Sequence, residues 1–181
     1  ARGMAREVTR AMQDLSMAGG RLAVELTEGE PTASGIERAE FLVAGHAGVS
    51  PKPLVRVASG GELARISLAI AVIAATATPV ATLIFDEVDA GIGGAVAETV
   101  GRLLKQLGGD RQVLCVTHLP QVAARGDQHL LVSKVQGVDG RPVCRIAQLD
   151  RKARVDELAR MLGGLQITET TRKHAREMLA S

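Results

Sequence analysis

A serine, two glycines and a glutamate occupy consecutive positions, Ser59, Gly60, Gly61 and Glu62, where a helix is predicted to begin. Glycine has no β-carbon, so the backbone amides of this turn can approach an anion closely. A helix N-terminus adds unpaired N–H donors and a partial positive charge. These four residues therefore predict a phosphate-binding turn. The alternative is an ordinary capping box, in which the Ser59 hydroxyl and the Glu62 carboxylate bind backbone amides.

Two carboxylates, Asp86 and Glu87, directly follow the apolar run 80–85. Such a run predicts a strand buried on both faces of a parallel sheet, and ligands of open α/β sheets bind beyond the carboxyl ends of the strands. Asp86 suits Mg²⁺, a hard cation that takes one or two protein carboxylates and keeps several waters. Glu87 would then orient or deprotonate an attacking water. The alternative is a strand that ends in two solvated acids.

One histidine, His118, closes the next predicted buried strand, over 112–117. Its imidazole would contact a terminal phosphate or help to position the attacking water, or it would only end the strand through a backbone hydrogen bond. We expect the turn at Ser59, the acidic pair and His118 to meet at one edge of a single sheet. A nucleoside triphosphate is the ligand that all three would share.

The apolar pattern predicts an α/β chain that positions these groups. Predicted helices cover 1–17, 59 to before Pro79, 94–107, 153–162 and 167–180, and predicted strands cover 21–26, 38–44, 80–85, 112–117, 128–134 and 142–149. The helix between the two buried strands forms a parallel crossover unit, and a turn at Asp139 and Gly140 makes the last two strands an edge hairpin. The expected fold is a mostly parallel sheet with flanking helices and this hairpin.

The order of these segments resembles the C-terminal lobe of ABC-type ATPase heads, in the P-loop NTPase superfamily. Within it, the chain is similar to the RecN family, DNA repair ATPases related to the SMC proteins. The resemblance covers essentially the whole chain. It rests on residues 57–63 (VASGGEL), 84–92 (IFDEVDAGI), 116–123 (VTHLPQVA) and 157–164 (ELARMLGG).

The resemblance implies a role for each candidate residue. Residues 59–61 would contact the γ-phosphate of ATP held by an opposing head, and Asp86 would serve Mg²⁺. Glu87 would be the catalytic base and His118 the switch histidine, both acting on ATP in their own head. ATP binding would close a dimer of heads, and hydrolysis would reopen it.

Two positions depart from the wider superfamily. Ala58 replaces the usual Leu before the signature serine, and Gly93 stands where transporters and SMC proteins usually carry an Asp in the loop after the acidic pair. Both departures resemble RecN. Gly93 leaves open how the two heads communicate.

The sequence contains no phosphate loop of the form GxxxxGK(S/T). In SMC-like proteins that loop lies in an N-terminal lobe beyond a long coiled coil, so we expect this chain to be inactive as an ATPase without that lobe. Residues 1–17 resemble the returning end of the coil, and 18–181 the C-terminal lobe of the head. The resemblance also implies a second head, double-stranded DNA ends and a recombinase as partners of a cytoplasmic, nucleoid-associated bacterial protein.

Composition restricts the other functions. A formal net charge of +2 with scattered Lys and Arg predicts no nucleic-acid surface by itself, and two Phe without Trp or Tyr argue against base stacking. Cys115 and Cys144 lie in short apolar runs without metal-ligand spacing, so we expect buried, reduced thiols. The uncharged stretch 66–85 contains Pro79 and predicts a buried helix and strand, and no membrane span.

Two rival functions remain at the level of the sequence. One is the head of another SMC or ABC-type ATPase, although the lack of a proline after Glu87 argues against a transporter. The other is a non-catalytic module with the same fold that binds DNA or protein without turnover. ATP binding and hydrolysis by the two lobes together would separate these functions.

Overall fold

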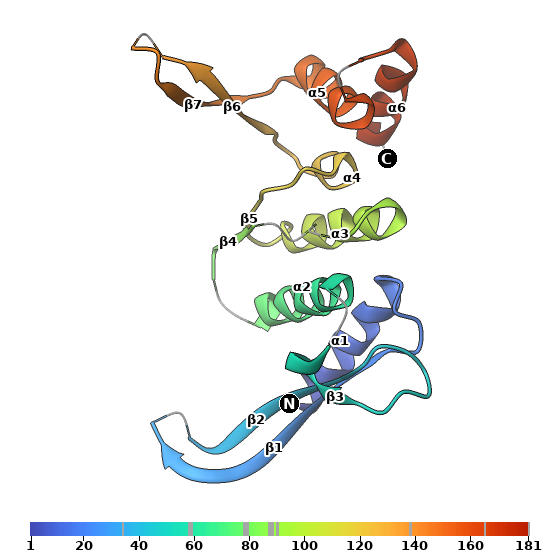
Figure 1. The fold of residues 1–181 in the computed structure, drawn as a ribbon, viewed down its shortest axis with the longest axis vertical. Helices are drawn as coiled ribbons and strands as arrows, with labels where there is room; N and C mark the ends of the chain where they lie inside the picture. Colours follow the sequence, from blue (N-terminus) through green and yellow to red (C-terminus); the bar gives the residue numbers. More distant parts are fainter. Residues whose placement is uncertain are drawn as a thin grey trace. The chain divides into compact units, whose positions relative to one another are not determined.

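The computed structural model describes residues 1–33, 35–57, 60–77, 80–86, 89, 91–137, 139–164 and 166–180. The chain divides into two compact units, Ala1–Val116 and Thr117–Ser181 (Figure 1). Both units contain helices and strands, which confirms the α/β class.

The first unit begins with a helix that packs on an antiparallel sheet. Helix α1 (Arg2–Asp14) buries one stripe of apolar residues and contacts β1 and α2. Strands β1 (Arg21–Thr32) and β2 (Gly35–Ala44) form a long curved ribbon, and β3 (Lys52–Pro53) pairs with β2 (Figure 1). The ribbon is longer than predicted, because its outer part is held by strand pairing and not by apolar burial.

The rest of the first unit is the predicted crossover. Helix α2 (Gly60–Ala77) follows a single 3-10 turn (Leu54–Arg56), and α3 (Gly94–Leu107) links β4 (Thr82–Phe85) to β5 (Gln112–Cys115). The pair β4–β5 is parallel, as predicted. Helix α2 contacts α1 and α3, and its buried side chains include Ile66, Ala69 and Val72.

The burial of β4 and β5 differs from the prediction of strands covered on both faces. Phe85 is 8% exposed, whereas its neighbour Ile84 is 71% exposed, and β5 alternates in the same way. The apolar run was a correct sign of a parallel strand, but only one face of the pair is covered by the described part of this unit. A mostly parallel sheet was also expected, but β4–β5 is the one parallel pair among the described strands.

In its described residues, the second unit consists of a hairpin and three helices. Short α4 (Pro120–Ala123) precedes β6 (Leu130–Gln136) and β7 (Pro142–Gln148), which pair antiparallel as the predicted edge hairpin. Helices α5 (Arg151–Gly163) and α6 (Glu169–Ala180) pack together through Leu158, Ala159 and Ala175. The Asp150 carboxylate accepts a hydrogen bond from the Ala153 amide at 2.7 Å, which caps α5.

Both cysteines are free, but their burial was predicted incorrectly. Cys115 is partly buried and Cys144 is exposed, because every residue of β7 is exposed on this hairpin. No helix in the described ranges has the length and apolar character that crossing a membrane would require.

Candidate functional site

Gly60 and Gly61 belong to the signature turn, the segment 59–62 that was predicted to bind phosphate, and they lie at the predicted helix start, that of α2. Gly60 and Gly61 are the first two residues of the helix, and Ser59 lies outside the described residues. A β-carbon on Gly61 would lie 3.6 Å from the carbonyl oxygen of Gly91, whose φ is +72°. The start of α2 therefore touches the loop that follows the acidic segment. This contact joins two of the three predicted site segments within one unit.

The Glu62 carboxylate lies in an unpredicted place. Its Oε1 atom is 3.4 Å from Nε2 of His46, and both carboxylate oxygens would be 3.6 Å from a β-carbon on Gly45. The predicted interaction with Ser59 falls outside the described residues. The sequence offered no sign of His46, because the loop after β2 carries no motif and its contact with α2 is formed only by the tertiary fold.

Negative charge collects at the carboxyl ends of β4 and β5. Asp86 is exposed directly after β4, and Asp89 is only 2% exposed in the following loop. Burial, then the charges of Asp89 and Asp86, raise the pKa of the Cys115 thiol to about 11. Glu87 lies outside the described residues. Asp86 and Asp89 together form the acidic edge, since the charges of both act on Cys115 at the end of β5. Asp89 was not predicted as a site residue.

The end of β5 runs beside the end of β4. The Val116 amide donates a hydrogen bond of 2.9 Å to the Phe85 carbonyl, which carries the parallel pairing one residue beyond Cys115. His118 comes two positions later, is exposed and belongs to the second unit. There the Leu119 amide donates to the Thr117 hydroxyl at 3.0 Å, which shapes the turn before α4. The meeting of His118 with Asp86 stays a prediction.

No preformed metal cage exists in the described ranges, since no three His, Cys, Asp or Glu side chains are grouped to hold an ion. A single exposed carboxylate such as Asp86 is still sufficient for Mg²⁺, which keeps most of its water ligands in nucleotide sites. The negative charges of Asp89 and Asp86, which contribute to the raised pKa of Cys115, also favour a cation at this edge. The described residues therefore fit Mg²⁺ bound with a nucleotide.

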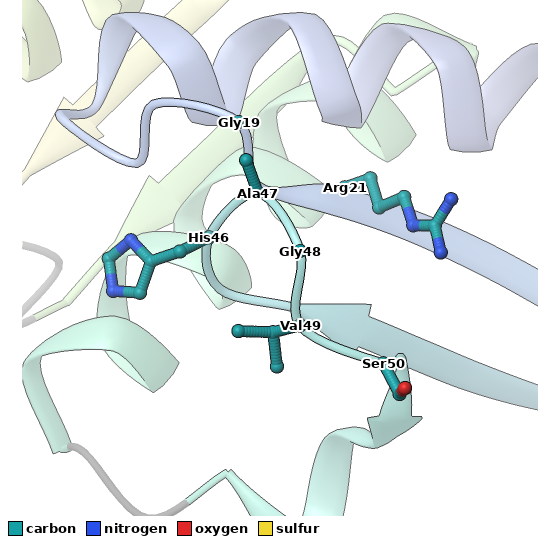
Figure 2. A pocket seen from close by; sticks show the side chains of 7 residues that line it. All are labelled: Gly19, Arg21, His46, Ala47, Gly48, Val49 and Ser50. Carbon is teal, nitrogen blue, oxygen red and sulfur yellow. The ribbon is translucent and has the colours of Figure 1, made fainter.

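A shallow hollow of about 460 Å³ is lined by the loop 46–50 together with Gly19 and Arg21. Figure 2 shows the Arg21 and His46 side chains pointing away from each other, so the hollow does not gather cationic groups around one anion. The loop that lines it carries His46, which contacts Glu62.

Comparison with known proteins identifies the chain. No family model matches it. The chain is 49% identical over 174 residues to the DNA repair protein RecN of Xylella fastidiosa, which covers 94% of this chain and 31% of that protein. It is 46% identical over 174 residues to RecN of Vibrio cholerae, with 95% and 31% covered, and 42% identical over 157 residues to RecN of Bacillus subtilis, with 85% and 27% covered. The chain belongs to the RecN family.

Solved structures agree with this assignment. The RecN-family chain matches the Smc head domain with a coiled coil and joint from Pyrococcus yayanosii with a TM-score of 0.67 and 25% identity, over 87% of this chain and 28% of that one. It matches an Smc head bound to the C-winged helix domain of ScpA with a TM-score of 0.65 and 26% identity, over 83% and 43%. The chain thus has the fold of the C-terminal part of SMC-like heads. It spans less than a third of the length of its RecN relatives.

Proposed function

We propose that this chain is the C-terminal half of a RecN ATPase head that acts in DNA double-strand break repair. In this proposal, residues 1–17 are the end of a coiled coil and 18–181 form the lobe. The observation that carries the proposal is that nearly the whole chain aligns with RecN and contains the signature and acidic segments without a phosphate loop. The chain would hydrolyse ATP only when the N-terminal lobe supplies that loop.

The uncovered face of β4–β5 supports the need for another lobe. Ile84 pairs with Leu114 on this face, and Val116 continues it toward the acidic edge. All three side chains are exposed, although parallel sheets are normally covered on both faces. The N-terminal lobe would pack on this apolar surface. The phosphate loop would then be brought to the carboxyl ends of the two strands.

The signature turn would act on a second head. Backbone amides at Gly60 and Gly61, with the Ser59 hydroxyl, would donate hydrogen bonds to the γ-phosphate of ATP in the opposing head, and Glu62 would shape the same turn. The contact of Gly61 with Gly91 ties this turn to the loop after the acidic segment. Phosphate binding across the dimer would therefore affect both the signature turn and the loop after the acidic segment.

The acidic edge would act on ATP in its own head. Asp86 would hold Mg²⁺, which when bound neutralises charge on the phosphate oxygens. Glu87 would accept a proton from the attacking water, and His118 would donate a hydrogen bond to the γ-phosphate. Asp86 and Glu87 are adjacent at the end of one strand, so the two roles fit one short segment.

Several partners come from the family alone. The relatives are bacterial DNA repair proteins, and one neighbouring structure, which is 24% identical, concerns ATP-driven dimerization and DNA-stimulated activation of SMC ATPases. We infer double-stranded DNA ends and a recombinase as partners of a head dimer that works in the cytoplasm at the nucleoid. The net charge of +2 does not by itself indicate a DNA-binding surface on this chain, so the inference of DNA as a partner rests on the family.

The test uses a protein that contains both lobes. The wild type should hydrolyse ATP, and Glu87→Gln should lower turnover by at least about 100-fold because the water loses its base. Size-exclusion chromatography with ATP should then show a persistent head dimer. Glu98→Gln, at an exposed position of α3, is the matched control and should leave turnover unchanged.

Two results would contradict this proposal. Unchanged turnover in Glu87→Gln would remove the catalytic role of that carboxylate. ATP binding by the wild type without any hydrolysis would favour a non-catalytic interaction module.

A further inference from the structure

The segment that carries His118 leads directly into a helix that is too short to be stable alone. The Thr117 hydroxyl accepts a hydrogen bond of 3.0 Å from the Leu119 amide, so His118 lies inside a turn just before α4. Helix α4 has only 4 residues, and an isolated helix of that length does not form in water. The backbone of His118 is therefore held in place by whatever supports α4.

Apolar packing against α5 and α6 gives α4 part of this support. Val122 on α4 is only 5% exposed, and Ala123 and Ala124 pack against the apolar cluster that α5 and α6 share. The cluster includes residues of the segment 157–164, which resembles RecN but has no part in the proposed ATP site. The second unit thus holds the chain just after His118 through a packed pair of helices.

Arg154 on α5 holds the end of the same segment through hydrogen bonds. Its Nη2 donates to the Gly126 carbonyl at 2.6 Å, and its Nη1 donates to the Asp127 carbonyl at 3.1 Å. A planar guanidinium can bind two carbonyls at once, and hydrogen bonds from a charged donor are stronger than those from a neutral one. Burial, and then the charge of Arg154, also lower the pKa of His129. One side chain therefore fixes the chain that follows α4.

We infer that Arg154 is a positioning residue for His118. By holding the Gly126 and Asp127 carbonyls against α5, it fixes α4 and, through α4, the turn from which the His118 imidazole would donate to the γ-phosphate. A displacement of about 1 Å at a catalytic group can cost on the order of 100-fold in rate, so this support affects turnover. The inference rests on the proposed function, which gives His118 its role. Arg154 does not itself touch ATP.

The experiment measures ATP hydrolysis by the protein with both lobes. Arg154→Met removes both hydrogen bonds and should lower kcat roughly 10-fold with KM within about twofold, because a displaced imidazole costs more in the transition state than in the ATP complex. Arg154→Lys can still donate to one of the two carbonyls and should lower kcat only about threefold. Arg151→Met, at an exposed arginine of the same helix, is the matched control and should behave as the wild type.

A double-mutant cycle separates positioning of His118 from a merely structural effect. In a His118→Ala background, Arg154→Met should have no further effect on kcat, because no imidazole remains to be positioned. If Arg154→Met leaves kcat unchanged, or if its effect persists in full without His118, the inference is wrong. If Arg154→Met does not fold, Arg154→Lys takes its place in the cycle. An unchanged kcat in Arg154→Lys, or a loss that persists without His118, would then overturn the inference.

The outcome is distinguishable from a failure of the proposed function. A wild type without ATPase activity would overturn both the function and this inference. Unchanged turnover in His118→Ala would overturn the role of His118 and, with it, the inference. A wild type that hydrolyses ATP, loses turnover in both Glu87→Gln and His118→Ala, and is indifferent to Arg154→Met would overturn only the role of Arg154.

Discussion

Cys115 and Cys144 have opposite surroundings, although similar apolar runs contain them. Cys115 ends β5, where burial and the carboxylates of Asp89 and Asp86 raise its thiol pKa to about 11. Cys144 is exposed in the middle of β7. Burial and, to a smaller extent, the carboxylates of the edge that would attract Mg²⁺ keep the Cys115 thiol protonated.

This difference predicts selective alkylation. The thiolate is the reactive form, and a pKa near 11 instead of 9.0 lowers its population at neutral pH by about a hundredfold. In Cys115→Ser, the remaining Cys144 should react readily with iodoacetamide at pH 7.5. In Cys144→Ser, the remaining Cys115 should react at least tenfold more slowly. Equal rates, followed by mass spectrometry, would show that burial and the neighbouring carboxylates do not raise the pKa of Cys115.

Individual residues were predictable where a local motif defines them. Gly60, Gly61 and Asp86 lie at the helix start and strand end that their motifs indicated. His46, Asp89 and the exposure of Cys144 were missed. Each depends on what a loop or strand packs against, and short-range patterns carry little of that information.

Strands β4 and β5 show the same limit at the level of elements. Their type, order and parallel pairing followed from apolar runs around a helix with glycines after it. Their burial could not be predicted in the same way. An apolar run indicates that both faces of a strand should be covered, but it does not indicate whether the same part of the chain covers them. Ile84 is the clearest case, with 71% of its surface exposed.

The exposed face of β4–β5 predicts that a substitution there weakens binding of the N-terminal lobe and leaves the stability of this chain nearly unchanged. Ile84→Asp should change the stability of this chain by no more than about 0.5 kcal/mol, because the side chain already contacts solvent. It should weaken binding of the separately expressed N-terminal lobe at least about tenfold, since a carboxylate would be buried in the contact. Val55→Asp, at a side chain that is 91% exposed in the 3-10 turn, is the control. Titration calorimetry would measure binding of the N-terminal lobe by both variants. If the two variants bound it with equal affinity, the lobe would pack elsewhere.

At the scale of the whole molecule, the proposed function makes two surfaces of this chain incomplete. The signature turn at α2 would need a nucleotide held by another head, and the acidic edge after β4 would need a phosphate loop and another head's signature turn. Both lie in the unit Ala1–Val116, while His118 belongs to the second unit, Thr117–Ser181. The α/β class, the crossover and the edge hairpin were predictable from the sequence. The division of the chain between 116 and 117 was not, because no linker composition marks it.

The central claim is that each ATP site is shared between two heads, and mixing two inactive variants tests it most directly. In the protein with both lobes, Ser59→Arg removes the signature turn and Glu87→Gln removes the base, so each variant alone should be nearly inactive. Mixed before ATP is added, they form heterodimers with one intact site, and turnover should recover to about a quarter of the wild-type rate. If the mixture stays as inactive as the separate variants, although heterodimers form, the signature turn and the acidic edge do not act across a dimer and the account is wrong.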